Sequence, residues 1–260
     1  MLIHSYFTDG MFDWAKLFLR SFKYFNGEQY KILLDTKNLK QKQIDELYSL
    51  YNNLEIYNEK LDMNKLARRA HIDPTILNKF KQETEKKKVN KNNKVWKLMI
   101  AADDRVKTVD SRLRELEEGY NLLHFDIDTF FDNKIDNIIE MVKTNDFITG
   151  YRTQKLTRKF GKVPKNRYNR ATLIYVMGFT NNKNSRKFMD TWIKYINATP
   201  PLKRHKGFGQ TTCYLAYLDC KDWLITEDVI KAKVWKNSNK GGKTGSMKKF
   251  SEMLDEWENQ

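Results

Sequence analysis

The chain has 260 residues and a mass of 31.1 kDa, which is enough for one large or two small domains with a buried core. Apolar residues make up 40% and aromatic residues 13%, so the composition excludes a disordered tail. The 48 Lys and Arg residues outnumber the 33 Asp and Glu residues, and the resulting charge of +15 favours anionic partners. Two cysteines, Cys213 and Cys220, are too few for a disulfide framework, and polar residues interrupt every apolar run before it reaches membrane-spanning length. We therefore expect a cytoplasmic protein without a membrane span.

The first 60 residues alternate between the apolar patterns of strands and of helices. Strands are predicted over 2–7, 30–34 and 54–57, and helices over 12–25 and 44–51. This alternation indicates a parallel sheet covered by helices, and such sheets bind ligands at the carboxyl ends of their strands. Tyr6, Thr8 and Asp35 are expected at those ends.

Residues 60–94 are predicted to form a helical insertion that ends in a Lys-rich polar run. A long helix follows over 95–116, and its Arg105 and Arg112 are seven residues apart, so they project from the same side. Next comes a strand over 121–125 that runs on into Asp126-Ile127-Asp128 and the residues up to 131. The elements expected after it are a helix over 135–142, strands over 147–149 and 171–179, a helix capped by Ser185, a helix after Gly207, a strand over 223–225 and a terminal helix that contains Phe250.

Asp126 and Asp128 carry the strongest chemical signal, because they follow a buried strand directly. Two adjacent carboxylates repel each other, and a cation such as Mn²⁺ or Mg²⁺ removes that repulsion. Such a metal could also neutralise a departing diphosphate. A capping Asp next to an exposed Asp is the simpler alternative, but the position after an apolar strand favours the metal.

Residues 111–116 (Ser-Arg-Leu-Arg-Glu-Leu) and 122–128 (Leu-Leu-His-Phe-Asp-Ile-Asp) resemble the core of GT-A glycosyltransferases, in particular the glycogenin and lipooligosaccharide-galactosyltransferase kind. The resemblance implies an α/β fold: a Rossmann-like mixed sheet with helices on both faces, plus the helical insertion and a basic acceptor-side region. It also implies a transferase that takes a sugar from a nucleotide-sugar donor, most simply a UDP-sugar, and uses Mn²⁺ or Mg²⁺.

The resemblance assigns roles residue by residue. Asp126 and Asp128 would bind the metal, and Tyr6, Thr8 and Asp35 the nucleoside. Arg112 would contact the donor, with Arg105 as its competitor. Asp128 and Gln210 are assigned as catalytic, although Gly209 stands where the family often has an acidic partner of the glutamine. The family's third metal ligand is often a histidine near the C-terminus, so here either His205 serves or water and phosphate complete the shell.

The predicted organisation is a single domain, 1–260. Residues 1–130 form the nucleotide-sugar-binding half, 131–235 the acceptor half, and 236–260 a basic loop and C-terminal helix. In the basic loop, Lys240 and Lys243 flank two glycines, a pattern that suits closure over a diphosphate. A basic linker before the terminal helix is an equal alternative.

Residues 147–189 contain eleven Lys or Arg residues and no Asp or Glu. Interleaved aromatic residues favour contact with a polyanionic acceptor, such as DNA carrying a modified base or an acidic glycan. A solvated basic surface without a ligand explains the pattern equally well.

Two other functions remain open at this point. Asp126-Ile127-Asp128-Thr129 fits the D-x-D-x-T motif of haloacid-dehalogenase-like phosphatases, in which the first Asp is a nucleophile. The charge alone would also suit a non-enzymatic nucleic-acid-binding protein. His4 and His124 have no ligand spacing and are predicted to be structural, and the two cysteines are predicted to be packing residues.

Overall fold

The structure is a computed structural model that describes residues 1–62, 95–153, 170–199, 208–229, 235–237 and 243–260. Nearly all of the predicted insertion over 60–94, most of the basic run between 151 and 170, and both His205 and Lys240 lie outside the described residues. Seven strands form the main sheet in the order β3-β2-β1-β4-β7-β6-β8. Their bounds are β1 Leu2–Thr8, β2 Lys31–Lys37, β3 Leu54–Glu59, β4 Asn121–Phe125, β6 Phe147–Thr153, β7 Arg170–Thr180 and β8 Thr226–Asp228.

The sheet is mixed, as predicted. β1 pairs in parallel with β2 and β4, and β2 pairs in parallel with β3. The long strand β7 is antiparallel to β4 and to β6. The parallel strands bring their carboxyl ends to one edge, where the polar side chains of interest lie.

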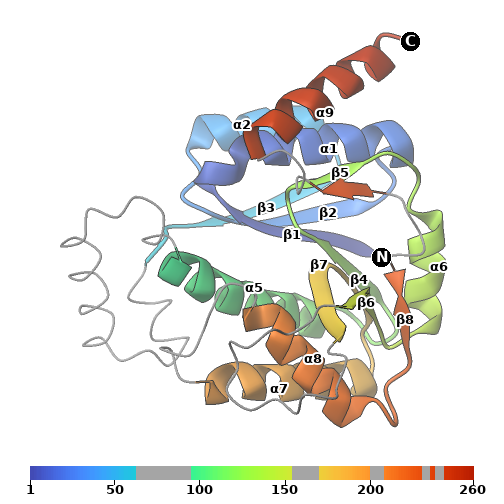
Figure 1. The fold of residues 1–260 in the computed structure, drawn as a ribbon. Helices are drawn as coiled ribbons and strands as arrows, with labels where there is room; N and C mark the ends of the chain where they lie inside the picture. The colour runs from blue at the N-terminus through green and yellow to red at the C-terminus, as the bar shows by residue number, and fades with distance from the viewer. Residues whose placement is uncertain (63–94, 154–169, 200–207, 230–234, 238–242) are drawn as a thin grey trace.

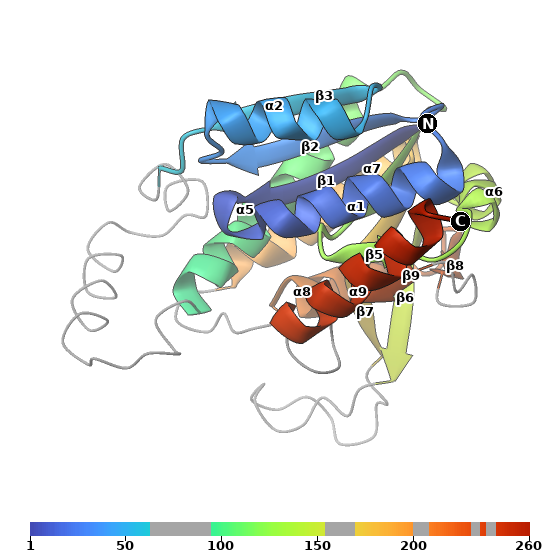
Figure 2. The same ribbon diagram turned by 90° about the horizontal axis from the view of Figure 1, so that it is seen from above.

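Helices cover both faces of the sheet (Figures 1 and 2). One layer contains α1 Phe12–Asn26, α2 Gln41–Leu50 and α9 Lys243–Glu258. The other contains α5 Val95–Glu115, α7 Lys183–Ala198 and α8 Phe208–Cys220. The remaining α-helix of the described residues, α6 Asp136–Thr144, follows β5 Thr129–Phe131 and lies at one end of the molecule in Figure 1. A short 3₁₀ helix, Asp9–Met11, connects β1 to α1.

Each face of the sheet has its own apolar core, because neighbouring residues of a strand point to opposite sides. Ile3 packs with the α1 side chains Phe18 and Phe22, whereas Leu2 packs with Phe188 and Trp192 of α7. Cys213 and Cys220 are buried in the second core, which confirms that they are packing residues. The single predicted α/β unit therefore contains two cores separated by one sheet.

The chain leaves the main sheet at the end of β4, whereas the sequence suggested one strand up to residue 131. A turn forms there, closed by a 3.0 Å hydrogen bond from the Thr129 amide to the Asp126 carbonyl. The next strand, β5 Thr129–Phe131, pairs with β9 Trp235–Asn237 in a separate two-stranded sheet. Asp126 and Asp128 thus sit in a turn between two sheets instead of along one strand.

Three local predictions are wrong. Asn182, and not Ser185, caps α7: its side chain accepts a 2.9 Å hydrogen bond from the Ser185 amide, while the Ser185 hydroxyl bonds to the Asp146 carbonyl. The strand predicted over 223–225 is instead β8, Thr226–Asp228, because its pairing with β6 decides its position. The strand predicted over 30–34 continues to Lys37, so Asp35 lies inside β2 and not at its end.

Candidate active site

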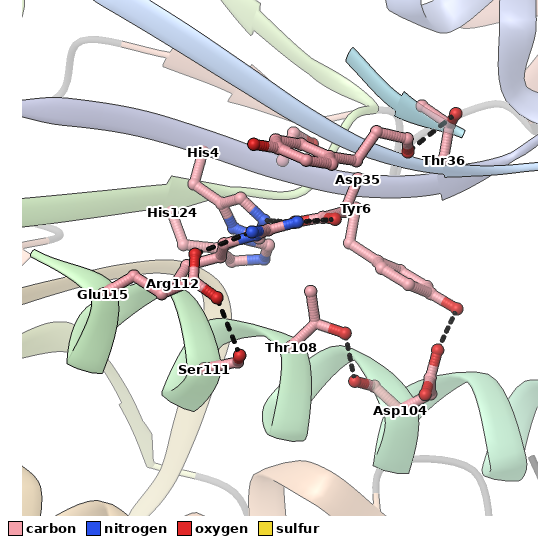
Figure 3. A network of polar contacts seen from close by, with 12 residues as sticks. His4, Tyr6, Asp35, Thr36, Asp104, Thr108, Ser111, Arg112, Glu115 and His124 are labelled. Atoms are coloured by element: carbon pink, nitrogen blue, oxygen red, sulfur yellow. Dashed lines mark hydrogen bonds and ion pairs between the residues drawn. The ribbon is translucent and has the colours of Figure 1, made fainter. Parts of the chain in front are cut away.

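The register of the parallel strands brings together residues that are far apart in sequence. His4 of β1 lies opposite His124 of β4, and Tyr6 of β1 lies opposite Asp35 of β2. Because side chains alternate along a strand, His4 and Tyr6 point to the same face, the one covered by α5. Figure 3 shows α5 contributing its own polar side chains, such as Arg112, to this face.

Arg112 and Asp35 form a bidentate ion pair, with guanidinium-to-carboxylate distances of 2.9 and 2.8 Å. The guanidinium also stacks 4.1 Å from the ring centroid of Tyr57 and bonds to Glu115. Burial opposes ionisation of Asp35, but the bonds from Arg112 and His4 outweigh it and lower the pKa of that carboxyl to about 2. Asp35 is therefore an ionised acceptor at neutral pH.

The second arginine of α5 pairs with the first aspartate of the D-x-D turn. Arg105 donates through Nη1 to Oδ1 of Asp126, and the two side chains are 15% and 29% exposed. Burial opposes ionisation here too, but the Arg105 charge outweighs it and lowers the pKa of Asp126. Of the two competing arginines, the structure thus places Arg105 at Asp126 and Arg112 at Asp35.

Two buried histidines connect these ion pairs. Nδ1 of His4 lies 2.8 Å from Nδ1 of His124, and Nε2 of His4 lies 3.0 Å from Asp35 (Figure 3). Nε2 of His124 lies 3.8 Å from Oδ1 of Asp126. Burial lowers the pKa of both imidazoles, that of His124 to about 3, so both rings are neutral. Both are buried, as structural histidines would be, but they contact two of the predicted site residues.

Near the carboxyl ends of β1 and β2, the predicted Tyr6 lies beside two residues that the sequence did not single out, Lys37 and Asp104. The Tyr6 hydroxyl donates a 2.9 Å hydrogen bond to Asp104 of α5. The nearly buried Lys37 ammonium lies 2.6 Å from Glu59 and 3.7 Å from Asp104. Burial and the Asp104 charge raise the pKa of Tyr6 far above its usual value, so this hydroxyl stays protonated. The spacing Asp35-x-Lys37 on one strand face was the signal that could have identified the lysine.

The remaining predicted residues lie around the D-x-D turn. Asp128 is half-buried, and Thr8 is the last residue of β1. Gln210 lies in the first turn of α8, next to Gly209, which packs closely against Ile174 of β7. The neighbouring Tyr175 carbonyl accepts a 2.7 Å hydrogen bond from the Asp126 amide. The first turn of α8 and Asp126 therefore meet the same short stretch of β7.

The C-terminal segment is anchored beside the same turn. Asn237 of β9 lies opposite Thr129, one residue after Asp128. After the interval that contains Lys240, α9 begins at Lys243, and its Phe250 stacks on Phe130 with ring centroids 4.5 Å apart. Both flanks of the predicted basic loop are thus attached to β5.

The donor set fits a metal held jointly by protein and substrate. Within the described ranges, no three His, Cys, Asp or Glu side chains gather into a metal-binding group. Asp126 and Asp128 provide hard oxygen ligands, and Mg²⁺ is commonly held by one or two carboxylates together with substrate phosphates.

None of the helices in the described part of the chain has the length and apolar character needed to cross a membrane.

Comparison with known proteins gives the fold a name. No family model matches the chain, and no curated protein is similar to it in sequence. Among solved structures, the galactosyltransferase LgtC, in complex with donor and acceptor sugar analogues, matches with a TM-score of 0.52 at 10% identity over 84% of this chain and 70% of that one. The fold is that of the GT-A glycosyltransferases.

Two other glycosyltransferases share this fold over part of their length. The apo form of GlyE from Streptococcus pneumoniae TIGR4 gives a TM-score of 0.50 at 11% identity, covering 88% of this chain and 45% of GlyE. The bifunctional WbbM gives 0.50 at 10% identity, covering 82% and 37%. The predicted fold class is confirmed, whereas the roles predicted for individual residues stay predictions.

Proposed function

We propose that the protein is a metal-dependent glycosyltransferase that moves a sugar from a nucleotide-sugar donor, most simply a UDP-sugar, to an acceptor hydroxyl. The observation that carries this proposal is the D-x-D turn at the carboxyl end of β4, within a GT-A fold and beside Arg105, which pairs with Asp126. The similar structure of LgtC contains donor and acceptor sugar analogues, which supports a sugar donor here.

The proposed chemistry breaks the bond between the anomeric carbon and the diphosphate and forms one to the acceptor oxygen, which loses its proton. Asp126 and Asp128 would hold Mn²⁺ or Mg²⁺, and the metal would supply positive charge to the departing diphosphate. Arg105 would supply a second positive charge at the same place. Lys240 and Lys243 of the C-terminal segment would add further positive charge at the diphosphate. Gln210, in the first turn of α8, would face the sugar.

The nucleoside would bind along the ends of β1 and β2. Tyr6 and Thr8 lie there, and the Tyr6 ring is held by its hydrogen bond to Asp104. Because Asp35 and Arg112 already bind each other, we propose that this pair forms a rigid wall of the nucleoside site. Arg105 would then be the arginine that contacts the donor.

The test compares Asp128→Asn with a matched control, Asp136→Asn. Asp136 is an exposed carboxylate in the first turn of α6, eight residues further along the chain. We expect UDP or a UDP-sugar to raise the melting temperature of the wild type and of the control only when Mn²⁺ is present. Asp128→Asn should lose this shift while it melts near the wild-type temperature without ligand. An equal shift in all three proteins would refute the metal assignment.

The acceptor is proposed to be a polyanion that contacts the acid-free stretch 147–189. In a transfer assay with a modified-base DNA acceptor, the apparent affinity should fall steeply with salt, since cation contacts release counterions. Transfer to a neutral oligosaccharide at a rate indifferent to salt would exclude that acceptor. Salt-dependent DNA binding without any sugar transfer would instead favour the non-enzymatic alternative. The phosphatase alternative predicts a different fold and is not carried further.

A further inference from the structure

A groove between α7 and α8 lies outside the proposed donor site. The two helices pack against each other on the face of the sheet opposite α1, α2 and α9 (Figure 1). The groove has a volume of about 380 Å³, within the range of about 300–1,000 Å³ that is typical of ligand sites. It reaches Cys220 at the end of α8, which lies about 15 Å along the helix from Gln210. The groove is therefore separate from the helix turn assigned to the sugar.

One face of α7 forms a basic wall of the groove. The residues that line it follow one another at spacings of one, three or four positions and so share one side of the helix: Lys187, Thr191, Lys194, Tyr195 and Ala198. Both lysines are exposed, and within the described residues neither ammonium has a carboxylate at ion-pair distance. The nearby Asp190 of the same helix binds Arg114 at 2.7 Å instead. The wall thus presents two cations whose charge is available to a ligand.

Trp223 provides a flat surface in the same groove. It follows the end of α8, where its amide donates a 3.1 Å hydrogen bond to the Cys220 carbonyl. The partly buried indole packs against the core on this side of the sheet, so the ring is held in place without a ligand. The Lys187 ammonium lies 4.5 Å from the ring centroid, which is a cation–π contact. A positive charge and an aromatic surface therefore meet at one point of the groove.

Asp219 is the one acidic residue among those that the structure describes around the groove. The Tyr195 hydroxyl donates a 2.6 Å hydrogen bond to it, and this bond raises the pKa of Tyr195 to about 12, so the hydroxyl keeps its proton at neutral pH. The carboxylate repels phosphate groups and accepts hydrogen bonds from amino groups, such as those on the edges of nucleobases. The groove thus offers lysines to an anionic backbone, and an aromatic ring and an acceptor to a base.

We propose that this groove binds a single-stranded nucleic acid, with a base stacked on Trp223 and the backbone phosphates at Lys187 and Lys194. Basic grooves with aromatic rings are the usual means of binding single strands, because every base has a face that can stack. In a duplex these faces are covered by neighbouring bases. The inference deepens the proposed function and rests on its polyanionic acceptor, to which it adds a contact away from the site of transfer.

The spacing of the two lysines favours a polymer over a single nucleotide. Lys187 and Lys194 are separated by about 10 Å along the axis of α7. Their ammonium groups can therefore meet different phosphates of one strand. A mononucleotide that binds as tightly as the strand would overturn this part of the proposal.

The test measures the anisotropy of a labelled, mixed-sequence DNA strand of about 12 nucleotides, without metal or sugar donor. Trp223→Leu should raise the Kd about tenfold, since it removes one base stack. Trp223→Phe keeps an aromatic face and should stay close to the wild type. A duplex of the same sequence should be insensitive to both substitutions. Equal losses for strand and duplex in Trp223→Leu would overturn the stacking.

Lys194→Gln tests the phosphate contact without disturbing the core, because this lysine is exposed. It should weaken binding of the strand and flatten the plot of log Kd against log salt by about 0.7. Lys248→Gln is the matched control: it removes the same charge from α9, where the 80% exposed lysine lies 3.7 Å from Glu252. The control should leave the Kd within about twofold. Equal losses in the two variants would overturn the proposal, since the net charge alone would then attract the strand.

An acidic glycan is the competing occupant. A hyaluronan oligosaccharide whose binding depends on Trp223, together with strand binding that does not, would overturn the nucleic-acid assignment. The Mn²⁺-dependent rise in the melting temperature of the wild type with UDP tests the proposed function separately. If that rise occurs and strand binding ignores the groove, only the groove proposal fails. If strand binding depends on the groove and no rise occurs, the proposed transferase fails instead.

Discussion

The docking of the C-terminal helix beside the D-x-D turn can be tested by Phe250→Ala. Phe250 is 7% exposed, stacks on Phe130 at 4.5 Å and meets Trp14 edge-on at 6.2 Å. Truncating a buried Phe to Ala costs about 3–5 kcal/mol. We expect about 3 kcal/mol, because α9 is terminal and can shift to fill part of the cavity.

The same substitution should weaken donor binding. If the donor requires the segment before α9 in its docked position, the apparent Kd rises in proportion as the docked fraction falls. We expect the Kd for a UDP-sugar in the presence of Mn²⁺ to rise about tenfold, which corresponds to about 1.4 kcal/mol. Urea unfolding gives the stability change, and calorimetric titration well below the melting temperature gives the affinity.

Phe188→Ala is the matched control. Phe188 is fully buried and stacks on Phe147 at 4.5 Å, but it belongs to the core on the opposite face of the sheet. It should lose similar stability and keep donor affinity within about twofold, since its cavity lies away from β5. Equal increases in Kd for both variants would refute the reasoning, because α9 would then contribute only to global stability.

Three further predictions concern stability. The free energy of unfolding should fall as the pH drops below 6.5. The buried neutral His4 has a lowered pKa, so only the unfolded chain binds a proton at this histidine. The contribution of His4 is at most about 1.4 kcal/mol per pH unit. His4→Gln, which keeps a donor toward β2, should flatten this slope in urea unfolding measured from pH 7.5 to 5, and an unchanged slope would contradict it. Gly178→Ala places a Cβ 2.4 Å from Cγ2 of Val142 and should cost about 1–3 kcal/mol, seen as a lower urea midpoint. Asn182→Ala removes the cap of α7 and should cost about 1 kcal/mol in the same assay, whereas no loss would mean that water replaces the cap.

Most elements follow from local patterns. The helix predicted over 95–116 is α5, Val95–Glu115, and the strand predicted from residue 121 begins there as β4, although β4 ends at Phe125. Periods of two and of 3.6 residues are properties of a short window of sequence, so they survive without tertiary information. The error at 223–225 has the opposite cause: β8 has three residues, and its bounds depend on pairing with β6.

The contacts of the histidine pair could not be predicted from local sequence patterns. His4 and His124 are 120 residues apart, and no spacing rule connects them. The parallel register of β1 and β4 makes them direct neighbours, and burial under α5 makes both neutral. The sequence indicated that they are structural residues, but their contacts with Asp35 and Asp126 depend on the pairing of distant strands.

The sequence by itself determined that α5 presents two arginines on one side and that two aspartates follow β4, because both are consequences of residue spacing. It could not determine which arginine meets which carboxylate. The strand order β2-β1-β4 separates Asp35 from Asp126 by one strand, and α5 spans that separation with Arg112 at one end and Arg105 at the other. Strand order is a non-local property of the fold, so only the tertiary structure could assign the pairs.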